Sequence, residues 1–516
     1  MFFSALIEFS RVSSTSVDRS SGDDSGKVYD FKDSRTSGVV TVTKSWDDSM
    51  SNDERTVPDI SISTEKPSKN PLGYTITYHG NGLTFADESS ENEIIVNSSG
   101  KILSGSYKLP DGLFAGWYSD KTCTKKVETD SNGLPVDGLM SDMDLYAKTK
   151  TFVLKKGSDF NKLIPSTATS VVFTDKAMPV STDLIDVDAD GDGGVVAWMD
   201  GTTMKVSTQT PGKQVIAAAD CQKMFDSKSK LISIDFSNLD TSKVTNMNDM
   251  FCYCRGLTNL DLSPLDTSKV THMYNMFRGC SGLISLDLSS LDTSNVYNMF
   301  AMFEDCSGLT SLDLTPLDTS KVYNMNLMFS GCSGLTTLDL TPLDTSKVTY
   351  MSQMFEGCSG LTSLDLTPLV TQNVTDMREM FSHCSGLTNL DLTPLDTSSV
   401  TSMYSMFSGC SGLTNLDLTP LDTRNVTDMK MMFYYCSKLT SLDLTSLNTS
   451  NVTDMDSMFY NCISLTALSI GEKFAFVGTN YQLPSGTWYS SNGTAYTSDG
   501  KKCTIPNNKA DTYTRR

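Results

Sequence analysis

The feature that most constrains this 516-residue chain is a repeat of fixed length. The dipeptide Met224-Phe225 recurs at intervals of 26 residues as far as Met458-Phe459. Nine cysteines keep the same interval: Cys254, Cys280, Cys306, Cys332, Cys358, Cys384, Cys410, Cys436 and Cys462. Cysteines that bind a metal usually come in close pairs, so this long, constant interval indicates a repeated structural unit. We predict about ten stacked units over residues 221–470.

The first half of each unit has the apolar spacing of a helix. In one representative unit, Met273, Met276, Phe277 and Cys280 stand at positions i, i+3, i+4 and i+7. That spacing predicts one buried stripe along two helical turns. Gly282 then stands where a glycine in the left-handed conformation would end the helix.

The second half of each unit has the spacing of a strand. Leu286 and Leu288 alternate with Ser285 and Asp287, which predicts a short strand with one buried face. One unit is too small to fold alone, so neighbouring units must cover each other. We therefore predict an α/β repeat solenoid, similar to leucine-rich repeats, with a parallel sheet and short helices. Ten coils at ~4.8 Å per strand would extend over about 45–50 Å.

The repeats resemble the BspA-like leucine-rich repeats of bacterial surface proteins. The resemblance rests on the pattern MFxGCSGLTxLDLTPLDTSxVTxM, which the segment from Met354 to Met377 follows almost letter for letter. It implies a secreted or surface-displayed protein that binds a protein or glycan on a host or on other microbes. The second hypothesis is a structural stalk or coat protein without a specific ligand.

A smaller module is expected before the repeats. Residues 73–149 resemble the internalin-type B repeat, a compact β-grasp-like module of surface proteins, and we expect all-β or α+β structure there. The positions that carry the resemblance are Tyr74, Gly80, Gly82, Leu109, Pro110, Phe114, Gly116, Trp117, Tyr118, Leu145, Tyr146 and Ala147. Residues 150–220 and 471–516 are predicted to cap the two ends of the solenoid.

The first 72 residues have a different composition. Residues 1–37 are predicted to be a flexible segment, rich in Ser, Asp, Gly and Lys. Residues 38–72 are interpreted as a linker with a strand that resembles the start of a Cna B-type domain, in which Lys44 is an ordinary exposed lysine. The first residues lack a basic leader, and we find no clear signal peptide or anchor. The expected extracellular or cell-surface location therefore rests on the resemblance.

Two sets of surface residues are candidate binding sites. The aspartates of the predicted strands would form an acidic ladder about 5 Å apart, suited to a basic or neutral ligand or to weakly bound divalent cations; the alternative is a hydrated surface without a ligand. The ladder comprises Asp261, Asp287, Asp313, Asp339, Asp365, Asp391, Asp417 and Asp443. The second set varies between units on the predicted solvent face of the helix and comprises Tyr274, Phe300, Leu327, Arg378, Tyr404 and Tyr434.

We predict no metal site and no cofactor. Asp186, Asp188 and Asp190 imitate half of a calcium loop, but the twelfth position is Ala197, where a bidentate Glu is required. This segment is interpreted as part of the hairpin that caps the first coil, and a calcium site is the alternative.

The histidines and the missing catalytic motifs lead us to predict that the protein is not an enzyme. The three histidines lie in unrelated contexts, and no nucleophile, phosphate-loop or dinucleotide motif occurs. The formal net charge of −20 disfavours nucleic acid as a partner. No window approaches eighteen consecutive apolar residues, so no membrane span is predicted.

Overall fold

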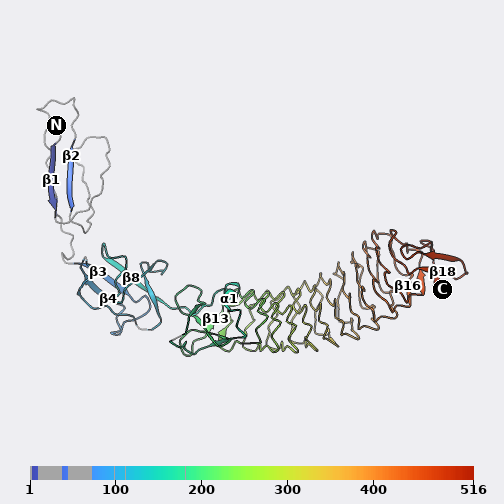
Figure 1. The fold of residues 1–516 in the computed structure, drawn as a ribbon, viewed down its shortest axis with the longest axis horizontal. Coiled ribbons are helices and arrows are strands. Elements are labelled where there is room, and N and C mark those ends of the chain that lie inside the picture. Colours follow the sequence, from blue (N-terminus) through green and yellow to red (C-terminus); the bar gives the residue numbers. More distant parts are fainter. Residues whose placement is uncertain (1–2, 10–37, 45–72, 98, 111, 181) are drawn as a thin grey trace, which may run out of the picture. The chain divides into compact units, whose positions relative to one another are not determined.

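The fold was analysed in a computed structural model that describes residues 3–9, 38–44, 73–97, 99–110, 112–180 and 182–516. The chain divides into two compact units, Met1–Lys150 and Thr151–Arg516 (Figure 1). Each unit has its own hydrophobic core. Of the predicted flexible segment 1–37 only residues 3–9 are described, and of the predicted linker 38–72 only residues 38–44; the other residues of both lie outside the described part of the chain.

The described residues of the first unit form two separate sheets. Strands β1 (Phe3–Phe9) and β2 (Gly38–Lys44) form an antiparallel pair. The second sheet has the order β5-β4-β3-β8-β6-β7, and its central strands β3 and β8 run parallel. Its strands are β3 (Tyr74–His79), β4 (Glu91–Val96), β5 (Ile102–Ser104), β6 (Phe114–Tyr118), β7 (Lys126–Val127) and β8 (Met143–Thr149). The rings of Tyr78 and Trp117 pack in its core with centroids 4.9 Å apart.

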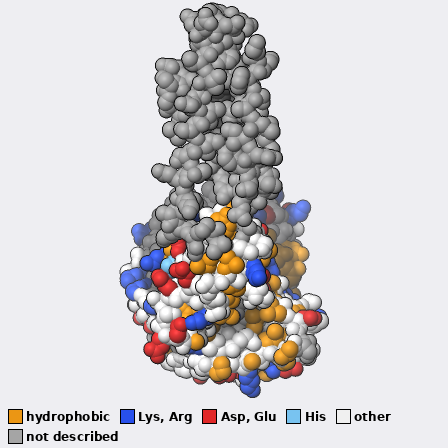
Figure 2. Space-filling view, turned by 90° about the vertical axis from the view of Figure 1, so that its left-hand side faces the viewer, with side chains coloured by type: hydrophobic (Ala, Val, Ile, Leu, Met, Phe, Trp, Pro, Cys, Tyr) orange, Lys and Arg blue, Asp and Glu red, His pale blue; other side chains and the backbone are white. Residues whose placement is uncertain are grey.

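The surface of this six-stranded module is chemically mixed. Figure 2 shows hydrophobic side chains lying among acidic and basic ones on the side that it views. Leu103, Leu109, Val136 and Met140 of the module are all exposed, and Met140 retains 86% of its accessible surface. Isolated exposed apolar side chains are common on folded proteins, so these residues alone do not define a site.

The second unit begins with a cap of strands and one short helix, α1 (Gly157–Leu163). Its main sheet has the order β10-β11-β12-β9-β14, formed by β9 (Ser170–Thr174), β10 (Ile185–Asp186), β11 (Val196–Asp200), β12 (Thr203–Ser207) and β14 (Ser233–Asp235). Strand β13 (Val215–Ile216) pairs with β15 (Leu239–Asp240). Because β9 pairs with β14 of the first repeat, and Phe160 of α1 packs on Phe225, the cap covers the first coil.

The repeats stack as coils with one column of phenylalanines inside. Neighbouring rings from Phe225 to Phe459 have centroids 5.6–6.1 Å apart and are almost parallel. Isolated parallel bridges, each joining residues 26 positions apart, link the coils from Asp220 to Asp454. Figure 1 shows the coils side by side along the array.

The predicted helices are absent from the described array, and the α/β assignment is wrong. Met273, Met276, Phe277 and Cys280 are all buried, as a helical stripe would be. Their backbone instead forms consecutive turns: Met276 N donates to Met273 O, whereas Phe277 N donates to Met302 O in the next coil. In the described residues α1 is the one α-helix, and it precedes the array.

The role predicted for Gly282 is also wrong. The left-handed positions of this coil are Asn275, at φ 55°, and Gly279, at φ 70°. Gly282 allows close packing instead, because a Cβ atom there would lie 2.4 Å from the carbonyl oxygen of Arg255 in the preceding coil. Most repeats keep glycine in this column, although Lys438 and Ser464 occupy it near the end of the array.

The continuous parallel sheet is not found either. The leucines of the predicted strands are buried, but among the described repeats only β14 near the first coil, and β16 (Ser441–Leu444) and β17 (Ala467–Ile470) near the last, are strands at these positions. The spacing of the phenylalanine rings exceeds the ~4.8 Å of paired strands. The middle coils are held together by core packing and by hydrogen bonds between turns.

The cysteine column is confirmed as a row of buried thiols. All thirteen cysteines are free, and the nine of the column are fully enclosed. Each Sγ donates to the carbonyl oxygen of the phenylalanine 29 residues earlier, as Cys358 does to Phe329 at 3.1 Å. Burial raises the pKa of these thiols, to about 12 for Cys410.

A second cap closes the far end of the array. Its sheet has the order β16-β17-β20-β18-β19, with β18 (Gly486–Tyr489), β19 (Ala495–Ser498) and β20 (Asp511–Arg515). Strand β20 pairs antiparallel with β17 of the last repeat. Trp488 and Tyr513 are fully buried there, so the core of the last coil is covered from water.

Candidate binding surface of the repeat array

The aspartates of the acidic ladder are exposed, and each stabilises its own turn. Oδ1 of every ladder residue accepts a hydrogen bond at 2.9 Å from the backbone N–H two residues later, as Asp365 does from Thr367. This contact with the backbone N–H of Thr367 holds the pKa of Asp365 below its usual value. The ladder therefore has a local structural role, whether or not it binds a ligand.

The variable residues lie within the chain of turns rather than on a helix. Tyr274, Phe300, Leu327, Tyr404 and Tyr434 are half-buried. Arg378 is the exposed member of the set. Four members share one column (Tyr274, Phe300, Arg378 and Tyr404), whereas Leu327 and Tyr434 stand in two other columns, so the six residues do not form a single column.

One face of the repeat array is built on a column of Thr and Tyr residues, whose side chains carry hydroxyl groups. The coils from residue 245 to 453 place a Thr or Tyr directly before a bridge residue, and in most of them its backbone N–H donates to the equivalent carbonyl of the preceding coil, as Thr401 does to Thr375 at 2.9 Å. The Thr401 hydroxyl donates to the same carbonyl oxygen at 3.1 Å. These repeated bonds fix the side chains of adjacent coils in register.

Four rings form an aromatic strip along this face. The strip consists of His272, Tyr297, Tyr323 and Tyr350, and successive ring centroids lie 4.9, 6.2 and 6.3 Å apart. The Tyr297 hydroxyl contacts Nε2 of His272. Tyr323 and Tyr350 remain 39% and 47% exposed, respectively. The strip presents apolar ring faces together with phenolic hydroxyls, a combination that is enriched in binding interfaces.

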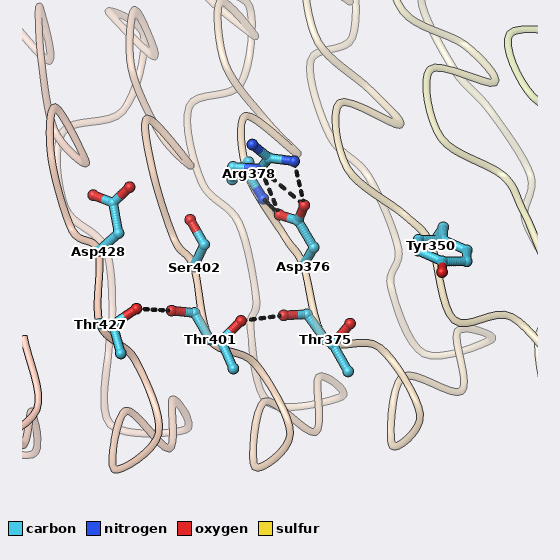
Figure 3. Close-up of a pocket in the computed structure, with 8 residues that line it drawn as sticks. All are labelled: Tyr350, Thr375, Asp376, Arg378, Thr401, Ser402, Thr427 and Asp428. Carbon is cyan, nitrogen blue, oxygen red and sulfur yellow. Dashed lines mark hydrogen bonds and ion pairs between the residues drawn. The ribbon is translucent and has the colours of Figure 1, made fainter.

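A shallow polar groove continues from the end of the aromatic strip. It is open, has a volume of about 470 Å³, and is lined by Tyr350, Thr375, Asp376, Arg378, Thr401, Ser402, Thr427 and Asp428 (Figure 3). Arg378 donates from Nε to both carboxylate oxygens of Asp376, at 3.0 and 2.8 Å. Partial burial raises the pKa of Asp428. The groove thus offers hydroxyl donors, carboxylate acceptors and one guanidinium group.

The sequence prediction missed most of this face. Arg378 belongs both to the predicted set of variable residues and to this face. Tyr323 and Tyr350 were not selected, because they precede the first methionine of their repeats and lay outside the predicted helix. A signal was present in the sequence: Tyr297 and Tyr323 replace the threonine that most repeats have at this position. A change to an aromatic residue in a threonine column marks a place where neighbouring rings can stack.

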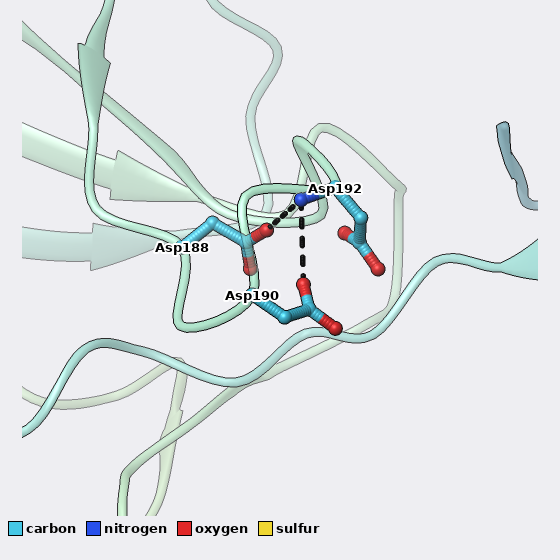
Figure 4. Close-up of side chains that lie close together, drawn as sticks. All are labelled: Asp188, Asp190 and Asp192. Atoms are coloured by element: carbon cyan, nitrogen blue, oxygen red, sulfur yellow. Dashed lines mark hydrogen bonds between the residues drawn. The ribbon is translucent and has the colours of Figure 1, made fainter. Parts of the chain in front are cut away.

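The aspartates that lie together in the structure are not the three predicted to form half of a calcium loop. Asp186 does not join the other two aspartates, because its carboxylate forms an ion pair with Lys155 Nζ at 3.0 Å. Asp188 and Asp190 instead converge with Asp192 (Figure 4). Burial and the neighbouring charge of Asp192 raise the pKa of Asp188 to about 7.

Comparison with known proteins supports a repeat protein of unknown function. Residues 219–313, 287–390, 308–412 and 384–472 match the family described as "Mycoplasma protein of unknown function, DUF285". Together these matches cover just under half of the chain, and the stacked coils are similar to DUF285 repeats. No curated protein matches the sequence. No described helix has the length and apolar character needed to cross a membrane.

One solved structure with a match is titled "Crystal structure of TLR13-ssRNA13 complex". The sequences are 13% identical over 49% of this chain and 49% of that chain, and the TM-score is 0.13. The match thus spans about half the length of that protein. With so low a TM-score, the match carries no argument about fold or ligand.

Proposed function

We propose that this is a non-enzymatic surface or secreted protein whose repeat array binds macromolecules of a host or of other microbes and so mediates adhesion. The observation that carries the proposal is the aromatic strip with its adjoining groove. The ligand class we infer is a glycan chain or an extended protein segment that is neutral or basic.

The chemistry of the face supports this ligand class. Exposed rings such as Tyr323 and Tyr350 can pack against the apolar side of a sugar ring or against an apolar side chain. The paired Asp376 and Arg378 can exchange hydrogen bonds with hydroxyl or amide groups. Because equivalent side chains repeat from coil to coil, an extended ligand can contact several coils at once, and the contributions of weak contacts combine.

The resemblance to BspA-like proteins supports a location outside the cell and a role in adhesion. The alternative is a stalk or coat protein without a specific ligand. One observation favours that alternative: the acidic ladder, the most regular surface feature, is already used in turns. The two functions differ in whether any defined ligand is captured.

The test is a binding screen with the immobilised full chain against arrayed glycans and extracellular-matrix proteins. Adhesion predicts salt-sensitive capture of at least one of them. The double variant Tyr323→Ala/Tyr350→Ala should weaken that capture roughly tenfold or more, since truncating an aromatic anchor commonly costs over 1 kcal/mol.

The matched control is Tyr460→Ala, because Tyr460 is 40% exposed but belongs to a separate cluster with Tyr434 and Tyr435. We expect the control to bind like the parent protein. Loss of binding in the control alone would move the site to that second cluster. Failure of the parent protein to capture any ligand would favour the structural role.

A further inference from the structure

The loop between β10 and β11 brings three carboxylates together. Asp188, Asp190 and Asp192 alternate along the loop, and each offers an oxygen that lies within 4.8 Å of those of the other two. Figure 4 shows the three side chains grouped around one turn of the chain. Oxygen atoms from carboxylates are the ligands that calcium prefers.

A second observation sets this cluster apart from an ordinary acidic surface. Asp188 is completely buried. Its Oδ2 accepts hydrogen bonds from the backbone N–H groups of Asp192, at 2.7 Å, and Gly193, at 3.1 Å. Its Oδ1 is equally enclosed but receives no hydrogen bond from any described residue. A buried carboxylate oxygen without a donor is rare and costly, and two further carboxylates beside it increase the cost.

Lys155, a basic side chain that contacts this loop, bonds to groups other than the Asp188 carboxylate. Lys155 Nζ is bound by the carboxylate of Asp186 at 3.0 Å and by the backbone carbonyl of Asp188 at 2.6 Å. The side chain of Asp188 points toward Asp190 and Asp192 (Figure 4). A cation placed among the three aspartates would supply the missing partner.

We propose that Asp188, Asp190 and Asp192 form a binding site for one calcium ion in the cap of the repeat array. The spacing D-x-D-x-D-G, with Gly193 at φ 73°, corresponds to the first six positions of a calcium loop. The register is two residues later than the sequence alone suggested, and Asp186 is excluded. This inference is independent of the proposed binding function.

The site is expected to be of low affinity. In the structural register the twelfth loop position is Met199, which cannot act as the bidentate ligand of a complete loop. Asp190 is exposed and Asp192 is half-buried, so water can complete the coordination shell. Calcium tolerates such an irregular shell better than magnesium does, and sites of this kind bind with Kd of ~10⁻⁴–10⁻³ M.

Ion binding should also stabilise the start of the second unit. Thr151 N donates to Asp192 Oδ2 at 2.9 Å, and the Thr151 hydroxyl donates to Asp190 Oδ2 at 3.1 Å. Two of the three proposed ligands therefore hold the first residue of this unit. A bound ion would fix these carboxylates and, through them, Thr151.

The experiment is calorimetric titration of the full chain with calcium chloride, repeated with magnesium chloride. We expect one calcium site and weaker binding of magnesium. Asp190→Asn and Asp192→Asn should each reduce calcium affinity at least tenfold. The control is Asp417→Asn, which changes an exposed aspartate with the same type of turn hydrogen bond and should bind calcium like the parent protein.

Absence of calcium binding would refute the proposal, as would binding that Asp190→Asn and Asp192→Asn leave unchanged. Reduced binding in Asp417→Asn alone would assign the ion to the acidic ladder instead. A second measurement does not depend on how the variants fold: amide exchange of the parent protein around 151–155 and 186–196 should be slower in calcium than in EDTA. Equal exchange rates would also contradict the site.

Discussion

The buried threonine column offers a direct test of how the coils are joined. Thr371 is 2% exposed, and its hydroxyl lies between two coils. It donates to the carbonyl oxygen of Asp396 at 3.0 Å and accepts from the N–H of the same residue at 2.8 Å. Thr371→Val keeps the shape of the side chain and removes both hydrogen bonds. At about 0.5–1.5 kcal/mol each, the loss should destabilise this junction by about 1–3 kcal/mol.

Amide hydrogen exchange is the suitable assay, because a chain of several units does not unfold in one step and has no single free energy of unfolding. The expected destabilisation corresponds to roughly 5- to 150-fold faster exchange at Asp396 and in the two coils beside it. The control is Thr362→Val, an exposed threonine of the same coil. Equal exchange in the two variants would refute the claim that these hydroxyls hold the coils together.

Three further predictions concern other columns of the array. Iodoacetamide at about pH 8 should modify the partly exposed Cys123 and spare buried thiols such as Cys410, whose pKa is about 12; peptide mass spectrometry distinguishes the two. Gly360→Ala should destabilise the junction with the preceding coil by about 1–3 kcal/mol and speed amide exchange there, because its Cβ would lie 2.5 Å from Ser333 O; Lys438→Ala, in the same column, should change local stability by less than about 0.5 kcal/mol. The folded-state pKa values of Asp313, Asp365 and Asp417 in the ladder lie below the unfolded value of about 3.9, so their stabilising contribution is present above about pH 4 and lost as the pH falls. Replacing Asp313, Asp365 and Asp417 together with Asn removes this contribution and should move acid unfolding, followed by circular dichroism, to higher pH, and an unchanged onset would contradict this reasoning.

The sequence was sufficient to predict which residues lie inside the array. A constant interval of 26 residues requires equivalent positions to stack, and Met, Phe, Cys, Leu and Val columns can stack only in the interior. The buried thiols of the cysteine column follow from that argument and are confirmed by the structure. The prediction did not depend on knowing the secondary structure, since burial is a property of the column.

The candidate binding face was harder to predict because it depends on contacts between coils. The stacking of Tyr297 on Tyr323 joins residues 26 positions apart. Which aspartates cluster in the acidic loop likewise depends on Lys155, which lies 31 residues before Asp186 and binds its carboxylate away from the cluster. Neither contact is visible in a local spacing rule, so the sequence prediction selected other tyrosines and a register of the loop that begins two residues earlier.

The helix prediction failed for a different reason, because two backbone conformations share one burial pattern. Consecutive turns also place side chains at i, i+3, i+4 and i+7 on one side, but only alternate N–H groups bond within the coil. Asn275 N and Phe277 N donate instead to Phe300 O and Met302 O of the next coil, at 2.9 and 3.0 Å. A helix would satisfy those groups internally and leave its neighbours joined by side chains alone.

The turns carry an energetic penalty that only stacking can offset. Each such coil holds two residues in the left-handed region, and for a residue with a Cβ atom this conformation costs roughly 1–2 kcal/mol. In an isolated coil the N–H groups that reach the next coil would also lose their partners. A coil of this kind is therefore stable only between neighbours or under a cap, which explains why strands β9 and β20 cover the two ends of the array. The same reasoning makes the caps, including the acidic loop beside Thr151, a part of the molecule on which the stability of every repeat depends.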